Sequence, residues 1–267
     1  MNDAIQLSPL LQKSYPERGF VIIPHIFTTT ALATLRNSFR TVLEDAGADR
    51  AVADCDLDQL ILRREAENHG LVYGASQSVG SSVATYELVG GSGVFDAICK
   101  VADCAKSELH LMPMYLIVQL PSDERFDYPW HQDGAYYPWC KKFLTLWFPI
   151  NRGTKRDTGT ISLIPGSHRE GLREADTFLK HGYFKQIQSK LGPNEEAQEF
   201  PLEMQLGDCC VMNGNTVHRS VANHSNTPRI AAVLRIANIA GQSYDRERFY
   251  CVHKSVAHGP GAETASP

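Results

Sequence analysis

The segment WHQDGAYYPW, residues 130–139, places a histidine and an aspartate two positions apart. In an extended chain the side chains at i and i+2 project to the same side, so His131 and Asp133 can face one cavity while Gln132 faces away or to the rim. An imidazole and a carboxylate placed in this way can both bind one divalent metal ion. Such a metal centre needs a third ligand from another part of the chain.

Two later histidines are candidates for that third ligand. His168 lies in PGSHRE and forms a second short pair with Glu170, but the preceding Pro-Gly-Ser marks a turn, so this pair is expected at a loop edge. His218 lies in NGNTVHRS, where the chain enters a predicted strand, and is the favoured ligand. His224 follows in ANHSNT, which is typical of a turn and disfavours this residue as the ligand.

An arginine follows His218 where the next predicted strand begins. HRSVANHSNTPRIAAVLRI leaves a strand, passes through a turn and enters a strand at Arg229, and a hairpin here would bring the guanidinium beside the metal. A guanidinium keeps its charge near neutral pH and binds a carboxylate with two hydrogen bonds. Two histidines, a carboxylate and a nearby arginine are typical of a non-haem iron(II) oxygenase with a dicarboxylate co-substrate. Arg235 lies about 20 Å further along the strand, so a structural ion pair is expected for it.

Composition and charge limit the classes of function. The chain has 267 residues, 43% hydrophobic and 21% charged, which fits a globular protein with a substantial core. A net charge of -4 and the lack of a Lys- and Arg-rich block disfavour nucleic acid and membrane surfaces as partners. No signal-peptide pattern and no stretch of roughly 18 apolar residues is present, so a cytoplasmic location is expected. Seven cysteines without a C-x-x-C pair predict reduced thiols.

The first part of the sequence is expected to be largely helical. GFVIIPHIF, residues 19–27, is typical of a short strand. Apolar residues at helical spacing then predict an amphipathic helix, which begins near Thr28 and can end at Gly47. DLDQLILRREAE is compatible with a helix, and VFDAICKVADCAKS predicts another. The Gly- and Ser-rich residues 74–93 are expected to be a loop that forms a mobile lid over an aromatic-lined mouth.

Beyond residue 108 the sequence becomes a series of short runs of β-forming residues separated by turn residues. Helices followed by many short strands favour an antiparallel sandwich or barrel with helices packed on one face. FPLEMQL, residues 200–206, alternates apolar and polar residues, as a half-buried antiparallel strand does. The predicted strands are LMPMYLIVQL, FLTLWFPI, GTISLIP, FPLEMQL, CCVMN and RIAAVLRIANI.

These motifs, in this order, resemble those of the phytanoyl-CoA dioxygenase family of iron(II)- and 2-oxoglutarate-dependent oxygenases. The resemblance covers roughly residues 15–240 and is strongest at WHQDGAYYPW, WFPIN, GTISLIPGSH and LGDCCVMNGNTVHRSVANHSNTPR. It implies a mainly β, α+β fold, a double-stranded β-helix of the jelly-roll, cupin-like type with N-terminal helices packed on one sheet. No linker divides the chain, so one catalytic domain is expected. It comprises a helical part with lid loops at 1–108, a jelly-roll core at 109–240 and a C-terminal extension at 241–267.

The resemblance also implies roles for individual residues. His131, Asp133 and His218 would be the catalytic iron(II) ligands. Arg229 would hold the distal carboxylate of 2-oxoglutarate, assisted by Ser220. Three further residues would lie along or near this co-substrate: Gln132, Trp147 and Tyr115.

Two positions depart from the pattern of the family. Gln119 stands where the family often has Lys in the strand before the His-x-Asp segment, and Thr158 stands where it often has Asn. The absence of a positive charge at position 119 argues against a substrate as large and anionic as an acyl-CoA. Tyr136 could be either a wall of the pocket or a core aromatic.

The implied reaction uses O2 and 2-oxoglutarate, releases succinate and CO2, and hydroxylates an unactivated C–H bond of a small-to-medium organic molecule. Desaturation and cyclisation are alternative outcomes, and the presence of Asp133 disfavours halogenation. Two other classes stay open: a metal-dependent jelly-roll hydrolase or isomerase that does not use 2-oxoglutarate, and a non-catalytic jelly-roll binding protein. Arg229 favours the oxygenase over the first class, and the intact His/Asp/His set favours it over the second. The sequence identifies neither the substrate nor the oligomeric state.

Overall fold

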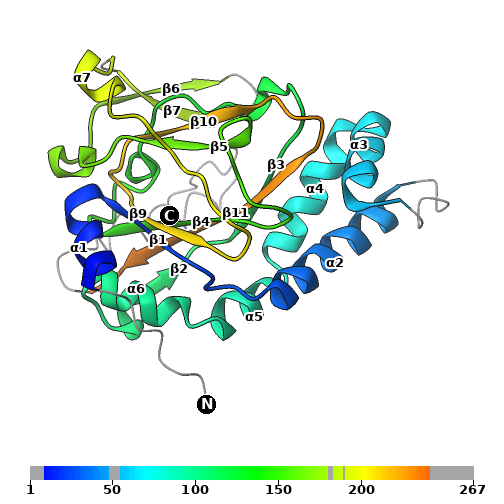
Figure 1. Cartoon of the computed structure of the whole chain (residues 1–267), viewed down its shortest axis with the longest axis horizontal. Coiled ribbons are helices and arrows are strands. Elements are labelled where there is room, and N and C mark those ends of the chain that lie inside the picture. Colours follow the sequence, from blue (N-terminus) through cyan, green and yellow to red (C-terminus); the bar gives the residue numbers. More distant parts are fainter. Residues whose placement is uncertain (1–8, 48–54, 180–182, 189, 241–267) are drawn as a thin grey trace, which may run out of the picture.

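The computed structural model describes residues 9–47, 55–179, 183–188 and 190–240. The expected C-terminal extension at 241–267 lies outside the described residues. Two antiparallel sheets face each other, and helices cover the outer face of the larger sheet (Figure 1). This arrangement confirms the predicted jelly-roll fold with helices on one sheet.

The larger sheet has six strands and the smaller sheet has three. The strands of the larger sheet are β1 (Phe20–Ile23), β2 (Leu109–Leu111), β3 (Tyr115–Gln119), β4 (Phe143–Pro149), β9 (Cys209–Asn213) and β11 (Arg229–Asn238). Their order is β1-β9-β4-β11-β2, and β3 also pairs with β11. The smaller sheet consists of β5 (Thr158–Leu163), β8 (Phe200–Pro201) and β10 (His218–Asn223), in the order β10-β5-β8. A separate hairpin is formed by β6 (Ala175–Leu179) and β7 (Tyr183–Ile187).

Alternate residues of β11 pack on opposite faces of the larger sheet. The even-numbered residues of 230–236 belong to the core beneath the helices, whereas Ala231 and Val233 belong to the core between the sheets. Arg229 and Arg235 share the parity of Ala231 and Val233, so both guanidinium groups project between the sheets. β11 therefore contributes residues to both cores and also places two guanidinium groups in the interior.

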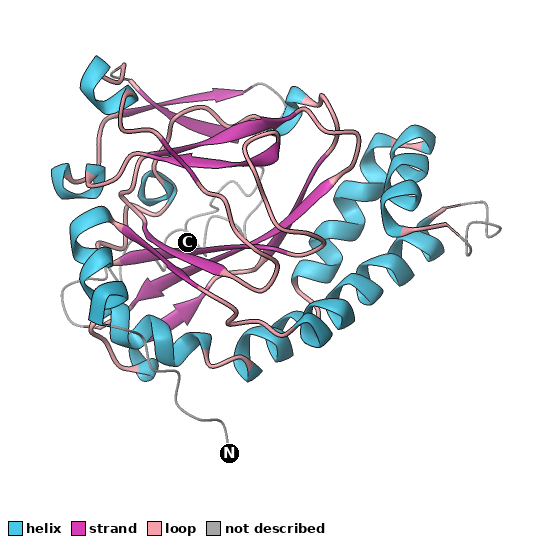
Figure 2. Ribbon diagram, in the orientation of Figure 1, coloured by secondary structure: helices cyan, strands magenta, loops and turns pink. Residues whose placement is uncertain are grey.

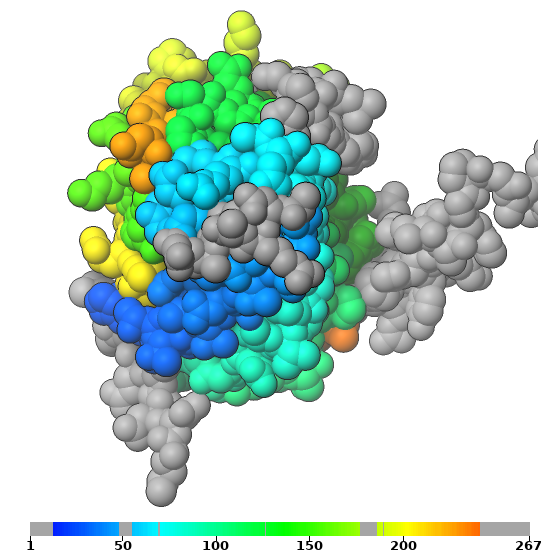
Figure 3. Space-filling view, turned by 90° about the vertical axis from the view of Figure 1, so that its right-hand side faces the viewer, coloured from blue at the N-terminus to red at the C-terminus, as the bar shows by residue number. Residues whose placement is uncertain are grey.

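The helices of the N-terminal part pack against the larger sheet. Their bounds are α1 (Pro9–Arg18), α2 (Thr29–Ala46), α3 (Leu57–Glu67), α4 (His69–Gly80), α5 (Val83–Gly91) and α6 (Val94–Ala102), and a short α7 (Pro193–Glu196) lies in the second half. Figure 2 shows α2 to α5 along one side of this sheet, and Figure 3 shows α2 to α4, in blue to cyan, forming that side of the surface. As predicted, Thr28 caps α2 by accepting from the Ala31 backbone N–H. No helix among the described residues is long and apolar enough to cross a membrane.

The prediction that residues 74–93 form a loop was wrong, because α4 and α5 occupy this segment. Gly80 explains why the composition misled: a Cβ there would lie 2.3 Å from the carbonyl oxygen of Met114. The glycine allows α4 to approach the chain just before β3, and it does not mark a flexible segment. α4 therefore forms a helical wall where a mobile lid loop was expected.

The strand predicted for residues 200–206 was also largely wrong, since β8 ends at Pro201. Leu202 and Met204 are buried between the sheets, and Met204 makes an isolated bridge with Thr154. The alternation of apolar and polar residues therefore reflects burial of one side of this segment. The segment does not form the continuous backbone hydrogen bonds of a strand. The six cysteines among the described residues are free, as expected, and Cys251 lies outside them.

Arg64 is fully buried and ties α3 to the end of α2. Its Nε donates to the carbonyl oxygen of Leu43 at 2.8 Å, its Nη2 donates to that of Glu44 at 3.3 Å, and its Nη1 pairs with Glu67. A Cβ at Gly47 would lie 1.9 Å from the Arg64 Nη1 atom. A cation thus satisfies the last carbonyl groups of α2, and the glycine that ends this helix makes room for it.

Substitution of Arg64 tests how much it contributes to the stability of the helical layer. Arg64→Leu should lower the free energy of unfolding by about 2 to 3 kcal/mol, because buried carbonyl groups lose charged hydrogen-bond donors. Arg63→Leu, at the exposed neighbouring position, should change it by less than about 0.5 kcal/mol. Urea denaturation of the two variants provides the measurement, and equal stabilities would contradict the structural role of Arg64.

Candidate active site

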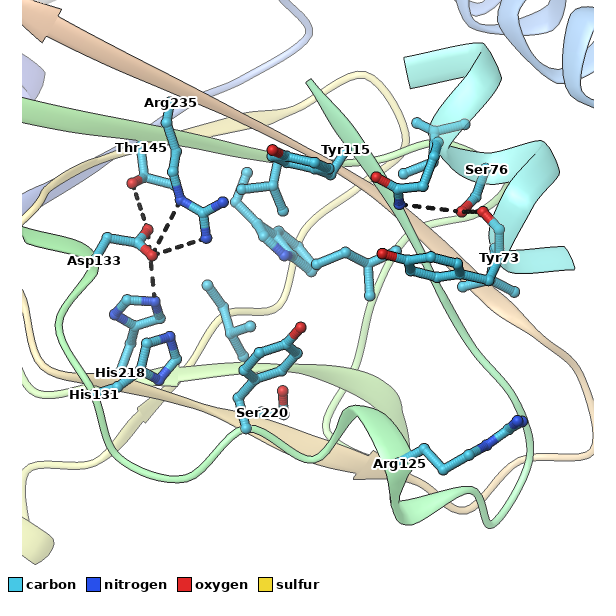
Figure 4. Close-up of a pocket in the computed structure, with 18 of the residues that line it drawn as sticks. Tyr73, Ser76, Tyr115, Arg125, His131, Asp133, Thr145, His218, Ser220 and Arg235 are labelled. Carbon is cyan, nitrogen blue, oxygen red and sulfur yellow. Dashed lines mark hydrogen bonds and ion pairs between the residues drawn. The ribbon is translucent and has the colours of Figure 1, made fainter. Parts of the chain in front are cut away.

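The three predicted metal ligands converge between the two sheets. His131 and Asp133 lie in the segment before β4, and His218 is the first residue of β10. One ligand atom from each residue lies within 4.8 Å of the others, and all three residues are buried. His131 and His218 also form an antiparallel bridge, with backbone N–O distances of 2.9 and 3.0 Å. Backbone pairing therefore places the two imidazoles side by side (Figure 4).

Both imidazoles are oriented for metal binding. The Nδ1–H of His131 donates to the carbonyl oxygen of Pro129 at 2.7 Å, and that of His218 donates to the carbonyl oxygen of Thr216 at 2.9 Å. A carbonyl oxygen only accepts, so the proton lies on Nδ1 and each Nε2 keeps its lone pair. Burial, together with the neighbouring His218, lowers the pKa of His131 to about 3, and burial lowers the pKa of His218. Both rings are therefore neutral near pH 7, as metal ligands must be.

The Asp133 carboxylate is held on both oxygens. Thr145 on β4 donates to Oδ2 at 2.5 Å, and Arg235 on β11 donates to Oδ1 through Nη2 at 2.9 Å and Nε at 3.2 Å. Burial acts to raise the pKa of Asp133, but the positive charge of Arg235, the two neighbouring imidazoles and the hydrogen bonds from Arg235 together hold the pKa well below the usual range. The carboxylate is therefore ionised, and Oδ2 lies 3.9 Å from Nε2 of His218. Two neutral imidazoles and a carboxylate suit a divalent transition metal.

Arg229 is a buried cation with unused donors. Its Nη2 donates to Oε1 of Gln119 at 2.6 Å, and its guanidinium lies 5.6 Å from the centre of the Trp147 ring. Among the described residues, neither Nε nor Nη1 has a hydrogen-bond partner. Burial lowers the pKa of Arg229 to about 10, so the group remains charged near neutral pH. Unpartnered donors on a buried charge are costly, and a carboxylate would satisfy them.

The hairpin expected between His218 and Arg229 was wrong. β10 pairs with β5 in the smaller sheet, whereas β11 pairs with β2, β3 and β4 in the larger sheet. The connection therefore crosses from one sheet to the other, and the two side chains approach the interior from opposite walls. Sequence spacing correctly located both strand starts, but it carried no information on which sheet each strand joins.

Gln119 supports Arg229 from the next strand. While Oε1 of Gln119 accepts from Arg229, its Nε2 donates to Oδ1 of Asp127 at 3.0 Å and to the carbonyl oxygen of Val221 at 3.2 Å. Gly159 has a φ of +81°, and a Cβ there would lie 2.4 Å from Oε1 of Gln119. A lysine at position 119 has no acceptor atom and would repel Arg229, so the departure at this position changes how the arginine is held.

A cavity of about 260 Å³ opens from the triad toward α3 and α4. Ser220, Trp147 and Tyr115 line it, and so does Tyr136, which is therefore a wall residue. On the side away from the triad, Arg125 pairs with Glu65 and Asp123 (Figure 4). The remaining lining is mainly tyrosine and aliphatic: Tyr73, Tyr128, Tyr137, Val72, Leu116, Ile117, Val118, Leu120, Ile161, Met212 and Val233. Such a surface suits a small organic molecule with apolar faces and a few polar groups.

Two of the predicted co-substrate residues, Arg229 and Gln132, are absent from this lining. Gln132 makes its hydrogen bonds on the side away from the cavity. Its Nε2 donates to the carbonyl oxygens of Gly171 and Asn215, and its Oε1 accepts from the Arg173 backbone N–H. The side chain faces away from the cavity because alternate residues of an extended segment point to opposite sides. Gln132 therefore ties together two loops behind His131.

Arg235 and Thr145 are the site residues that sequence reasoning missed. Arg235 makes an ion pair, as expected, but its partner is the triad carboxylate and it also lines the cavity. The even spacing of Arg229 and Arg235 along one strand could have indicated this role, because it places both side chains on the interior face of β11. His168 and His224 do not belong to the metal-binding group found among the described residues.

The sequence matches the model of the phytanoyl-CoA dioxygenase (PhyH) family over residues 15–231. A phytanoyl-CoA dioxygenase 1 from rice, Oryza sativa subsp. japonica, is 30% identical over 127 residues, which are 45% of this chain and 42% of the rice protein. A 1-deoxypentalenic acid 11-beta-hydroxylase from Streptomyces arenae is 33% identical over 105 residues, which are 38% of this chain and 36% of that protein. The matched segments thus span less than half of these relatives.

Solved structures show the same fold. EvdO2 from Micromonospora carbonacea var. aurantiaca, in complex with 2-oxoglutarate, has a TM-score of 0.60 at 19% identity, covering 89% of this chain and 94% of EvdO2. The epimerase SnoN, in complex with Fe3+, alpha ketoglutarate and nogalamycin RO, has a TM-score of 0.60 at 15% identity, covering 96% of this chain and 91% of SnoN. Since the family model covers most of the sequence, this chain belongs to the phytanoyl-CoA dioxygenase family.

Proposed function

We propose that this chain is an iron(II)- and 2-oxoglutarate-dependent oxygenase that hydroxylates a C–H bond of a small-to-medium organic molecule and releases succinate and CO2. One observation carries the proposal. A buried His/Asp/His triad with both Nε2 atoms free lies between the two sheets, as does a buried arginine that has two unpartnered nitrogens. A hydrolase or isomerase that does not use 2-oxoglutarate would have no use for those donors of Arg229.

His131, Asp133 and His218 would hold the metal, and the cavity gives the co-substrate and substrate access to it. Iron, when bound, would supply the activation of O2 that attack on an unactivated C–H bond requires. Arg229 would bind the distal carboxylate of 2-oxoglutarate, with Ser220 as a further donor. Trp147 and the aliphatic wall would exclude water from the reacting groups, which strengthens every charge interaction inside.

The substrate proposed is a small molecule whose reacting part enters the cavity. A volume of about 260 Å³, shared with 2-oxoglutarate, suits a small reacting group. The tyrosines offer hydroxyl groups for orientation, and the aliphatic residues offer contact for apolar faces. The cytoplasmic location expected from the sequence stays a prediction.

The depressed pKa values of the two histidines predict how metal binding responds to acid. A lowered pKa extends the neutral form to lower pH, so between about pH 7.5 and about pH 5.5 protons should not compete for Nε2 of His131, and should compete for that of His218 less than for an ordinary imidazole. The dissociation constant for Co(II), measured by calorimetry, should rise by less than about tenfold over this range. Two imidazoles with ordinary pKa values would instead lose affinity by about 100-fold, and such a loss would contradict the geometry described.

Arg229 should determine the affinity for 2-oxoglutarate. Arg229→Met, which keeps an unbranched apolar stem but removes the guanidinium, should raise the dissociation constant of 2-oxoglutarate for the Co(II)-loaded protein about 100-fold, corresponding to charged hydrogen bonds worth about 2.7 kcal/mol. Arg219→Met is the matched control, because Arg219 lies on β10 and its guanidinium is already paired with Glu199. Unchanged affinity in Arg229→Met, or release of no succinate by the iron-loaded wild type with any substrate panel, would count against the proposed function.

Gly159→Ala should weaken the support of Arg229 through Gln119. A Cβ at position 159 would displace Oε1 of Gln119, so the affinity for 2-oxoglutarate should fall several-fold, or about 1 kcal/mol. Gly171→Ala is the control, because Gly171 has a similar φ of +78° but open space around its Cβ position. Both variants carry backbone strain of about 1 to 3 kcal/mol, visible in urea denaturation, but Gly171→Ala should bind 2-oxoglutarate normally. Equal 2-oxoglutarate affinities of the two variants would disprove the role of Gln119.

A further inference from the structure

The two oxygens of the Asp133 carboxylate are treated differently by their neighbours. Oδ1 accepts two hydrogen bonds from Arg235, at 2.9 and 3.2 Å, and so uses both of its lone pairs. Oδ2 accepts one hydrogen bond, from Thr145, and keeps a second lone pair. Oδ2 is also the oxygen that faces the imidazoles, at 3.9 Å from Nε2 of His218 (Figure 4). One oxygen is thus available to a metal and the other is not.

We propose that Arg235 is a positioning residue that confines Asp133 to metal binding through Oδ2 alone. This inference rests on the proposed function. A carboxylate that is free to turn can bind a metal through both oxygens, and the second oxygen would occupy a position that the co-substrate needs. By holding Oδ1, Arg235 keeps that position open.

Charge gives Arg235 a second effect on the same site. A divalent ion bound by one carboxylate and two neutral imidazoles leaves one net positive charge, and the guanidinium of Arg235 adds another. With the guanidinium of Arg229, the site carries three positive charges, against the two negative charges of 2-oxoglutarate. In a buried site with low dielectric, this excess of positive charge favours binding of the dianion. The charge of Arg235 therefore favours the co-substrate.

The surroundings of Arg235 show that its position is fixed from several sides. It projects from β11 into the space between the sheets, and its guanidinium lies 5.9 Å from the centre of the Tyr115 ring on β3. Arg125 provides a contrast in the same cavity: it also pairs with carboxylates, Glu65 and Asp123, but it contacts no member of the triad. Arg125 is therefore a matched control for loss of a cavity-lining, ion-paired arginine.

The test compares Arg235→Gln, Arg235→Lys and Arg125→Gln by calorimetric titration with Co(II) and then with 2-oxoglutarate. Arg235→Gln should still bind Co(II), with a loss of affinity no greater than the 10- to 100-fold typical of a lost outer partner. Measured on the Co(II)-saturated protein, its dissociation constant for 2-oxoglutarate should rise about tenfold. Arg235→Lys keeps the charge without the paired donors and should recover part of the lost affinity. Arg125→Gln should resemble the wild type in both titrations.

Three results would overturn the proposal: unchanged 2-oxoglutarate affinity in Arg235→Gln, complete loss of Co(II) binding in that variant, or equal losses of 2-oxoglutarate affinity in Arg125→Gln. If Arg235→Gln does not fold, a crystal structure of the Co(II)-loaded wild type decides instead. Oδ2 alone on the metal, with Arg235 on Oδ1, supports the proposal, and both oxygens on the metal contradict it. Wild type that binds no Co(II) would refute the proposed function itself, which separates the two failures.

Discussion

A single buried carboxylate determines how the interior of this protein is organised. Asp133 is ionised at 1% exposure, and an uncompensated charge at such a depth would cost several kcal/mol. The compensation comes from Thr145 on β4 and Arg235 on β11, while His218 approaches from β10 in the opposite sheet. The two sheets must therefore close around this group in one register, so the packing of the sheets and the geometry of the candidate metal site depend on each other.

The parts of the site that could be predicted are those encoded over short stretches of sequence. The alternation of an extended segment placed His131 and Asp133 on one side, and the turn before Arg229 correctly located the start of β11. The spatial partner of each strand was not encoded in this way. Sequence spacing suggested that β10 and β11 form a hairpin, whereas they belong to opposite sheets, because the choice between sheets depends on packing of distant residues.

Two of the wrong predictions have another physical cause in common. The glycines of α4 and α5 were interpreted as flexible, although Gly80 in fact allows a close approach of two backbones. Arg235 was placed far from the site because its distance was measured along the strand from Arg229. The distance that matters is the one to Asp133, which reaches β11 from another segment. In both cases the sequence feature was local, whereas its structural role depends on a contact between segments that are far apart in the sequence.

Each imidazole of the triad donates its Nδ1 proton to a carbonyl group of its own segment, at Pro129 for His131 and at Thr216 for His218. The tautomer is thus maintained by neighbouring backbone, without a contribution from the side chains of α3, α4 or β3 that form much of the cavity wall. Substitutions in that wall can accumulate during evolution while the donor atoms keep their orientation. The molecule that the cavity accepts can therefore change while the metal-binding atoms of the triad stay in place.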